Sequence, residues 1–138
     1  MRIVGKVRVN QELRTSNKMT QGGWYWLLDR LLNGVLPAHL THIAVGDGTI
    51  APQEGDVALV NELARKALTS QTRDDLTDLI ETTFDKNEAI FTWKEVGLFA
   101  GGTDTIGTGT LIARALLTEA KDIYRTATVT WQLEVTES

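Results

Sequence analysis

Apolar and polar residues alternate along most of the second half of the chain. The clearest stretch is TATVTWQLEVT near the C-terminus, which places Ala127, Val129, Trp131, Leu133 and Val135 on one face. Threonines, Gln132 and Glu134 occupy the other face, so this stretch predicts a strand with one buried and one solvated side. Alternation at Ile80, Thr82 and Phe84, the segment AIFTWKEVGLFA and residues 111–117 predict further strands.

One segment has helical periodicity instead. After Gly22–Gly23, a spacing of about 100° per residue places Trp24, Leu27, Leu28, Leu31 and Val35 on one face. Trp26 then falls on the polar face with Asp29, Arg30 and Asn33. Gly34 is suited to end the helix, and Pro37 prevents it from resuming.

The remaining segments are short. Residues 40–45 alternate as a strand that ends in GDGT, where Gly46 and Gly48 predict a tight turn with positive φ. Asp56 is placed to cap a short helix from Val57, although ARKALTSQT is equally compatible with a strand. The start of the chain alternates at Ile3, Val7 and Val9, as expected of a short strand or extended arm, and the polar run 10–21 is interpreted as a loop.

Together these patterns predict a mainly β (α+β) fold. We expect an antiparallel β-sandwich or barrel-like sheet with one or two short helices. The 138 residues form a single domain, 1–138, in which 1–20 is an extended N-terminal arm and loop and 21–138 is the β-rich part.

Composition narrows the function. The net charge of −4 argues against a nucleic-acid partner, and the apolar clusters are too short to span a membrane. The chain has no cysteine, which excludes disulfides and thiolate catalysis. The basic first ten residues lack the features of a signal peptide, so we expect synthesis in the cytoplasm.

No pattern of catalytic residues stands out. His39 and His42, near Asp47, are three residues apart, which on a strand sends the two rings to opposite sides, so we expect no metal site. The glycine-rich VGDGT and GTDTIGTG lack a phosphate-binding frame. Serines and neighbouring carboxylates occur in no catalytic context, namely Ser16, Ser70, Ser138, Asp74, Asp75 and Asp78. We therefore expect no enzyme and no cofactor.

Five pieces of sequence, in order, resemble the N-terminal domain of bacteriophage tail-collar fibre proteins. They are a helix, a strand ending in Gly-x-Gly, a proline-bearing loop, an Asn-Glu-x-x-Arg segment and a Glu-x-Gly-Leu-Phe strand. The matching residues, within roughly 20–117, are Gly46, Gly48, Pro52, Asn61, Glu62, Arg65, Glu95, Gly97, Leu98 and Phe99. Such fibres usually continue into a shaft and a receptor-binding tip, whereas this chain ends after one more strand.

The resemblance implies a virion structural protein of the tail, baseplate or fibre-attachment region. It favours a homo-oligomer, preferably a trimer, that contacts other virion proteins and resides in the virion. One alternative is a capsid-decoration protein. A more remote one is a glycan-binding or hydrolytic module for the host surface, in which tryptophans stack on sugars, namely Trp24, Trp26, Trp93 and Trp131.

Glu95 stands among apolar residues in WKEVGLFAGG and therefore needs a partner if it is buried. The hypothesis is that Arg65 takes this carboxylate and holds two segments in register; the alternative is that both side chains are solvated. Gly97 is interpreted as a site of close approach or a bulge.

Candidate interface residues are Trp26 and the apolar positions of the first segment, Ile3, Val7 and Val9. A tryptophan on a polar helix face is covered either by the chain's own N-terminal arm or by another subunit. If the terminal strand lies at a sheet edge, the arm is a candidate to pair with it, within one chain by default or by exchange between copies.

Overall fold

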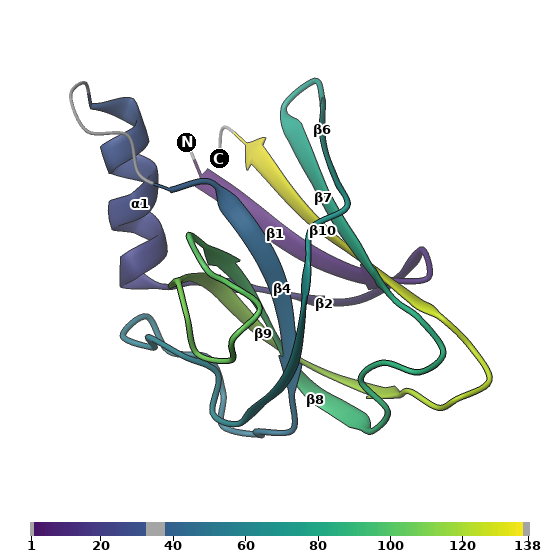
Figure 1. Ribbon diagram of the computed structural model, residues 1–138. Helices are drawn as coiled ribbons and strands as arrows, with labels where there is room; N and C mark the ends of the chain where they lie inside the picture. Colours follow the sequence, from purple (N-terminus) through teal and green to yellow (C-terminus); the bar gives the residue numbers. More distant parts are fainter. Residues whose placement is uncertain (1, 33–37, 137–138) are drawn as a thin grey trace.

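The computed structural model describes residues 2–32 and 38–136, which form ten strands and one helix (Figure 1). The prediction of a mainly β fold with a short helix is confirmed. In chain order the elements are β1 (Arg2–Val9), β2 (Glu12–Ser16), β3 (Lys18–Met19), α1 (Gln21–Leu31), β4 (Leu40–Gly46), β5 (Glu62–Ala67), β6 (Ser70–Asp74), β7 (Thr77–Phe84), β8 (Thr92–Ala100), β9 (Thr110–Ala120) and β10 (Ala127–Thr136).

The strands form two five-stranded antiparallel sheets. The order in the first sheet is β2-β1-β10-β7-β6, and the order in the second sheet is β3-β9-β8-β4-β5. Between β5 and β6 the chain crosses from one sheet to the other, where Leu68 N–H donates to Thr41 O at 2.9 Å and Thr69 N–H to Glu81 O at 2.9 Å. Buried residues of both sheets share one core, so the two sheets pack against each other, consistent with a β-sandwich.

The main core lies between the sheets. Phe84 of the first sheet meets Trp93 of the second edge-on, with ring centroids 5.2 Å apart. The predicted inward face of β10 is confirmed at Ala127, Val129 and Trp131, which are buried. Thr130, expected on the wet face, is buried too and donates a hydrogen bond to Glu81. Burial along β10 thus departs from strict alternation at Thr130.

The N-terminal segment is an integral part of the first sheet. β1 pairs with β10 from Arg2↔Thr136 to Val9↔Val129, so β10 lies between β1 and β7 and is no sheet edge. Pairing within one chain, the default expectation, is what the structure contains. Val7 and Val9 are buried in the core, so their predicted interface role is wrong. The expected loop 10–21 contains β2 and β3.

The helix begins earlier than predicted, and its inward face is rotated from the predicted one: Trp24 and Leu27 are partly buried, as expected. Thr20 caps it by accepting the Gly23 N–H at 3.0 Å, and Gly23 is buried against the Ile112 carbonyl of β9. Because the helix approaches β9 through this glycine, Leu28 and Leu31, predicted inward, are exposed. The predicted roles of Asn33, Gly34, Val35 and Pro37 concern positions outside the described residues.

The second helix proposed from Val57 is wrong. Residues 57–61 belong to the connection between β4 and β5, and ARKALTSQT forms the end of β5 and the start of β6. The alternative reading of that segment as strand is the correct one.

Candidate interaction surface

Residues 47–61 connect β4 to β5 and lie against the outer face of the second sheet. Leu59 from this loop packs with Ala44, Phe99 and Leu111, forming a small cluster separate from the main core. The tip of the loop reaches the start of the helix, where Gln21 N–H donates to Glu54 O at 2.7 Å. The loop occupies the lower left of Figure 1, below α1.

Glu95 fixes this loop from beneath. Its side chain on β8 is fully buried, and its two oxygens accept the backbone N–H groups of Gly48, Val60 and Asn61, each at 2.8 Å. A buried carboxylate without partners would cost several kcal/mol. Three main-chain donors supply those partners, so the burial of Glu95 depends on the loop staying in place.

Arg114, on the neighbouring strand β9, completes the arrangement. Its Nε donates to Glu95 Oε1 at 3.0 Å, and its two terminal nitrogens donate to Asp56 Oδ2 at 3.1 Å and to Ile50 O at 2.7 Å. Asp56 in turn accepts the Gln53 N–H at 2.8 Å. A planar guanidinium can hold several acceptors at once. The side chain therefore ties two strands and two points of the loop together.

The glycines of this region make room for the loop. A Cβ on Gly97 would lie 2.7 Å from Leu59 Cδ2, and one on Gly46 would overlap the Asn61 carbonyl. A Cβ on Gly48 would collide with Val60 and the Glu95 carboxylate. Close approach at Gly97 was expected and is confirmed. The expected positive φ at Gly46 and Gly48 is wrong, because both glycines serve close packing instead.

The predicted Arg65–Glu95 ion pair is wrong. Arg65 lies on the edge strand β5, and β4 separates it from β8, whereas β9 with Arg114 adjoins β8 directly. Arg65 instead pairs with Glu62 through Nε at 2.6 Å and Nη2 at 2.9 Å. The alternative, that Arg65 and Glu95 are each exposed to solvent, is wrong as well, since both of these side chains are buried.

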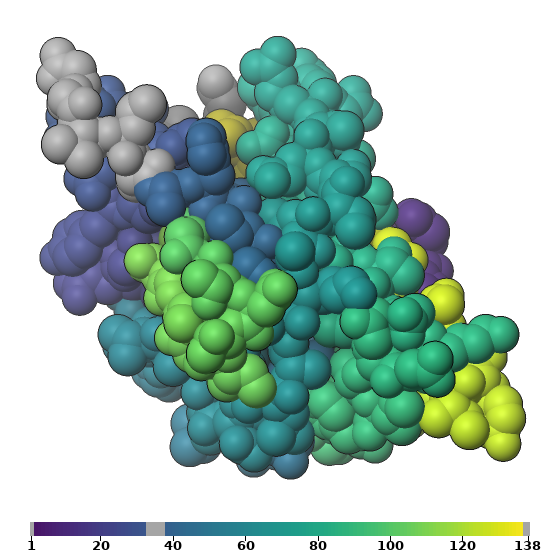
Figure 2. All heavy atoms as spheres, viewed as in Figure 1, coloured from purple at the N-terminus to yellow at the C-terminus, as the bar shows by residue number. Residues whose placement is uncertain are grey.

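Arg65 fixes a different loop. Its guanidinium lies over the Phe99 ring at 4.6 Å and donates to the carbonyls of Thr108 at 2.8 Å and Thr103 at 3.1 Å. The loop 101–109 that it holds (green in Figure 2) lies between α1 and the strands of the second sheet in that view. Each loop of this face is thus held by a buried arginine.

The fixed loop 47–61 presents apolar side chains to solvent. Val57 is 83% exposed. Ile50, Val60 and, at the start of β5, Leu63 are also exposed. We call these four residues the loop patch. A rigid backbone with exposed apolar side chains is what a preorganised protein-binding surface requires.

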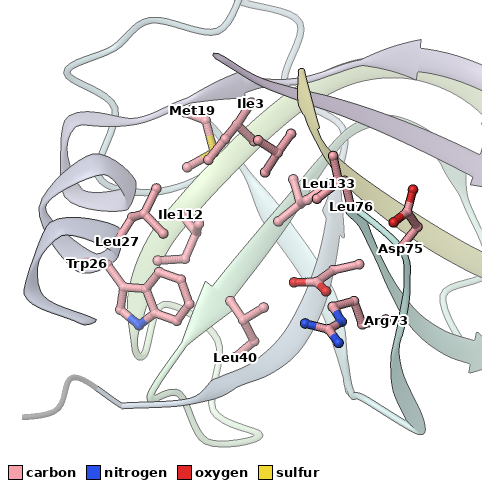
Figure 3. Close-up of a pocket in the computed structure, with 12 residues that line it drawn as sticks. Ile3, Met19, Trp26, Leu27, Leu40, Arg73, Asp75, Leu76, Ile112 and Leu133 are labelled. Atoms are coloured by element: carbon pink, nitrogen blue, oxygen red, sulfur yellow. The ribbon is translucent and has the colours of Figure 1, made fainter. Parts of the chain in front are cut away.

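Trp26 and Ile3 lie away from the loop patch. They line an apolar cavity of about 270 Å³ between α1 and the β6–β7 turn (Figure 3). Trp26 is half-buried, points into this cavity and donates from Nε1 to Ala38 O at 2.7 Å. Its expected position on a polar, outward helix face is therefore wrong.

The histidines contact different partners. His42 Nε2 lies 2.9 Å from Asp104, and His39 Nδ1 lies 3.4 Å from Arg30. Within residues 2–32 and 38–136, no three side chains of metal-ligating type gather. The same ranges contain no helix long and apolar enough to cross a membrane.

Sequence reasoning missed Arg114, Asp56 and Leu59. Arg114 carried a usable signal, because an arginine inside the apolar run LIARALL must be paired if that strand is buried. Asp56 was noticed only as a helix cap, and Leu59 gave no signal of its own.

Comparisons with protein families, with curated protein sequences and with solved structures found no match to this chain. The resemblance to tail-collar fibre domains therefore stays a prediction.

Proposed function

We propose that this chain is a non-enzymatic structural protein of a bacteriophage virion. It works in the tail, baseplate or fibre-attachment region as a homo-oligomer, of which a trimer is the favoured form. It docks onto other virion proteins through the loop patch. The proposal joins the sequence resemblance to the geometry of one surface.

The main support for the proposal is that buried charged residues hold a surface loop in one conformation. Glu95, Arg114 and Asp56 hold loop 47–61 in one conformation, with Oε and guanidinium contacts of 2.7 to 3.1 Å. Several residues that carry the resemblance, among them Gly46, Gly48 and Glu95, meet at this point. Binding by a loop that is already ordered avoids the entropic cost of ordering it on contact.

The tryptophans weaken the glycan-binding alternative. Trp93 and Trp131 are fully buried in the core, so neither can stack on a sugar. Trp24 and Trp26 are half-buried on the helix, and Trp26 already bonds Ala38. A tail protein and a capsid-decoration protein share the same docking physics, and their difference is one of location.

Location in particles is the direct test. Antibody labelling and mass spectrometry of purified particles of the encoding phage are expected to find the protein at the tail or baseplate. Labelling over the capsid would favour the decoration role, and absence from particles would remove the virion proposal.

Variants test the loop patch itself. Val57→Glu, at an 83% exposed position, is expected to reduce incorporation into particles at least tenfold while leaving the fold intact. The matched control is Ile123→Glu, also at an exposed apolar position, in the loop between β9 and β10 on the other side of the molecule (Figure 1). Equal incorporation of both variants would show that the loop patch is not the docking surface.

A further inference from the structure

The helix α1 carries apolar side chains on both of its sides. Trp26 and Leu27 face the cavity, and Gly23 packs on β9. On the opposite side, three apolar residues of the helix and the residue that caps its C-terminus are exposed: Tyr25 at 58%, Leu28 at 52%, Leu31 at 73% and the cap Leu32 at 64%. A helix on the surface of a soluble protein normally turns a polar face to water, whereas the exposed residues of α1 are mainly apolar apart from Gln21 and Asp29.

The spacing of the exposed residues suits another helix. Tyr25, Leu28 and Leu32 are three and four residues apart, which places them in one stripe along the helix, and Leu31 widens the stripe. Arg30 is turned away, with its guanidinium 5.3 Å from the centre of the Trp26 ring. Asp29, which is exposed, borders the stripe beside Tyr25, and the side chains of the stripe itself are apolar.

We propose that the outward face of α1, formed by Tyr25, Leu28, Leu31 and Leu32 and here called the helix seam, packs against the helix seam of another copy of this chain. The inference rests on the proposed function and adds to it the surface through which the copies associate. It is separate from the loop patch, which serves other virion proteins.

Charge and symmetry favour a second copy over a lipid surface. The chain carries a net charge of −4 and the helix has a single cationic residue, Arg30, already held against Trp26, so attraction to an anionic membrane is absent. An apolar stripe can pack against the same stripe of a second copy, because each partner then presents apolar side chains to apolar side chains, as a two-fold interface between identical subunits requires.

The area of the helix seam sets the expected strength. Four side chains exposed by half to three-quarters offer on the order of 400 Å² of apolar surface, the size of the largest patch on a typical monomer. A pair of copies then buries roughly 800 Å², less than the roughly 1,200 Å² at which standard stable interfaces begin. We therefore expect weak, concentration-dependent association in solution, strengthened in a particle where further contacts act together.

Cross-linking of single-cysteine variants tests the geometry, and the chain has no native cysteine to interfere. With a short bismaleimide, Leu28→Cys is expected to give at least tenfold more covalent dimer than Val57→Cys, the exposed control in the loop patch. Equal yields would overturn the proposal. Preferential cross-linking between Leu28→Cys and Val57→Cys in a mixture would overturn it too, in favour of a helix-to-loop contact.

Sedimentation measurements from micromolar to millimolar concentration test the energetics. The parent chain is expected to shift towards dimer or trimer, and Leu28→Glu with Leu32→Glu to remain monomeric. Both positions are exposed, so the double variant is expected to melt like the parent. The control is Ile123→Glu, outside both proposed surfaces, which is expected to associate like the parent. A parent that stays monomeric, or a double variant that still associates, would overturn the proposal.

Flotation with phosphatidylcholine vesicles covers the lipid alternative. Binding of the parent to vesicles, lost in the double variant, without cross-linking in solution, would replace the second copy by a membrane. The helix seam and the virion role fail separately: a monomer found in particles contradicts only the helix seam, and an associating protein absent from particles contradicts only the virion role.

Discussion

Glu95 and Arg114 are two fully buried charged residues whose partners come from loop 47–61 or from each other. Desolvation of an ion pair costs free energy that the mutual attraction offsets only if the remaining donors and acceptors are also bonded. Here the additional bonds come from Gly48, Val60 and Asn61 on one side and from Ile50 and Asp56 on the other. Such a network specifies one conformation of the loop more than it increases the net stability of the fold.

Removal of the Glu95 charge is expected to be strongly destabilising. Glu95→Gln should lower the free energy of unfolding by about 3–5 kcal/mol, because it leaves Arg114 buried with part of its charge uncompensated. Urea denaturation measures the loss. The control is Glu12→Gln on the exposed strand β2, expected within about 0.5 kcal/mol of the parent. A loss at Glu95 as small as the control would contradict the structural role of this network.

Gly97 tests the close approach of the loop. Gly97→Ala is expected to cost about 1–3 kcal/mol, because the new methyl group would overpack against Leu59. The Gly97→Ala, Leu59→Ala double variant should lose less free energy of unfolding than the sum of the two single variants, since the second change removes the side chain that the new methyl group would contact. Gly55→Ala, with nothing within 4 Å of the new atom, is the control. Purely additive losses would show that the loop does not press on Gly97.

At the scale of the elements, two connections of the second sheet are held in place by buried charged side chains. Loop 47–61 is held by Arg114 and Glu95, and loop 101–109 by Arg65, so the two longest connections of the second sheet are each fixed by a guanidinium. His42 on β4 also contacts Asp104 in loop 101–109 at 2.9 Å. These contacts turn segments without regular structure into fixed surface.

A more exposed ion pair joins β5 to the turn before β8. Lys66 Nζ lies 2.6 Å from Glu88 Oε2, and about a third of each side chain is exposed. The backbone N–H of Asp85 and then the Lys66 ammonium lower the pKa of Glu88 below its ordinary 4.5. The hydrogen bond to Glu88 raises the pKa of Lys66 above its ordinary 10.5.

The pair therefore stabilises the fold between these limits. Its contribution is lost as the pH falls below 4.5 through the lowered pKa of Glu88, and as the pH rises above 10.5 through the raised pKa of Lys66. Glu88→Gln is expected to cost about 0.5 kcal/mol near neutral pH, the range of partly exposed pairs. Urea titrations at acidic and neutral pH should show the gap between variant and parent closing in acid. A gap independent of pH would contradict the assignment.

On the scale of the whole molecule, the core and the two proposed docking surfaces are formed by different parts of the chain. The sandwich buries its apolar residues between the sheets, where the Phe84–Trp93 contact joins them. The helix seam and the loop patch lie on the same side of the view in Figure 1, whereas other exposed apolar residues, among them Leu13, Leu76 and Ile123, lie on other elements. The first and last strands pair from Arg2↔Thr136, so both termini lie together, above the cavity end of the sandwich. Both proposed docking surfaces therefore lie on one side of the molecule in that view.

The sequence predicted those strands whose alternation survives in the fold. β4, β7, β8, β9 and β10 were all expected, since each buries every second side chain or a continuous apolar run. β2 and β3 were missed because a polar edge strand has no alternating signal of its own. The helix was expected, but its orientation was not. The periodicity is read from apolar side chains, and Gly23, which has no side chain, adds nothing to that pattern. The contact face was decided by the close approach that glycine permits.

What the sequence determined by itself is the class of fold and the need of Glu95 for a partner, because alternation and the cost of a buried carboxylate are local properties of the chain. Which arginine meets Glu95 was decided only by the tertiary structure. Arg65 and Arg114 are both chemically able to bind it, but strand order puts β9 beside β8 and leaves β5 one strand further away. The same holds for the helix: its apolar residues are written in the sequence, and only packing on β9 determines which of them remain outside.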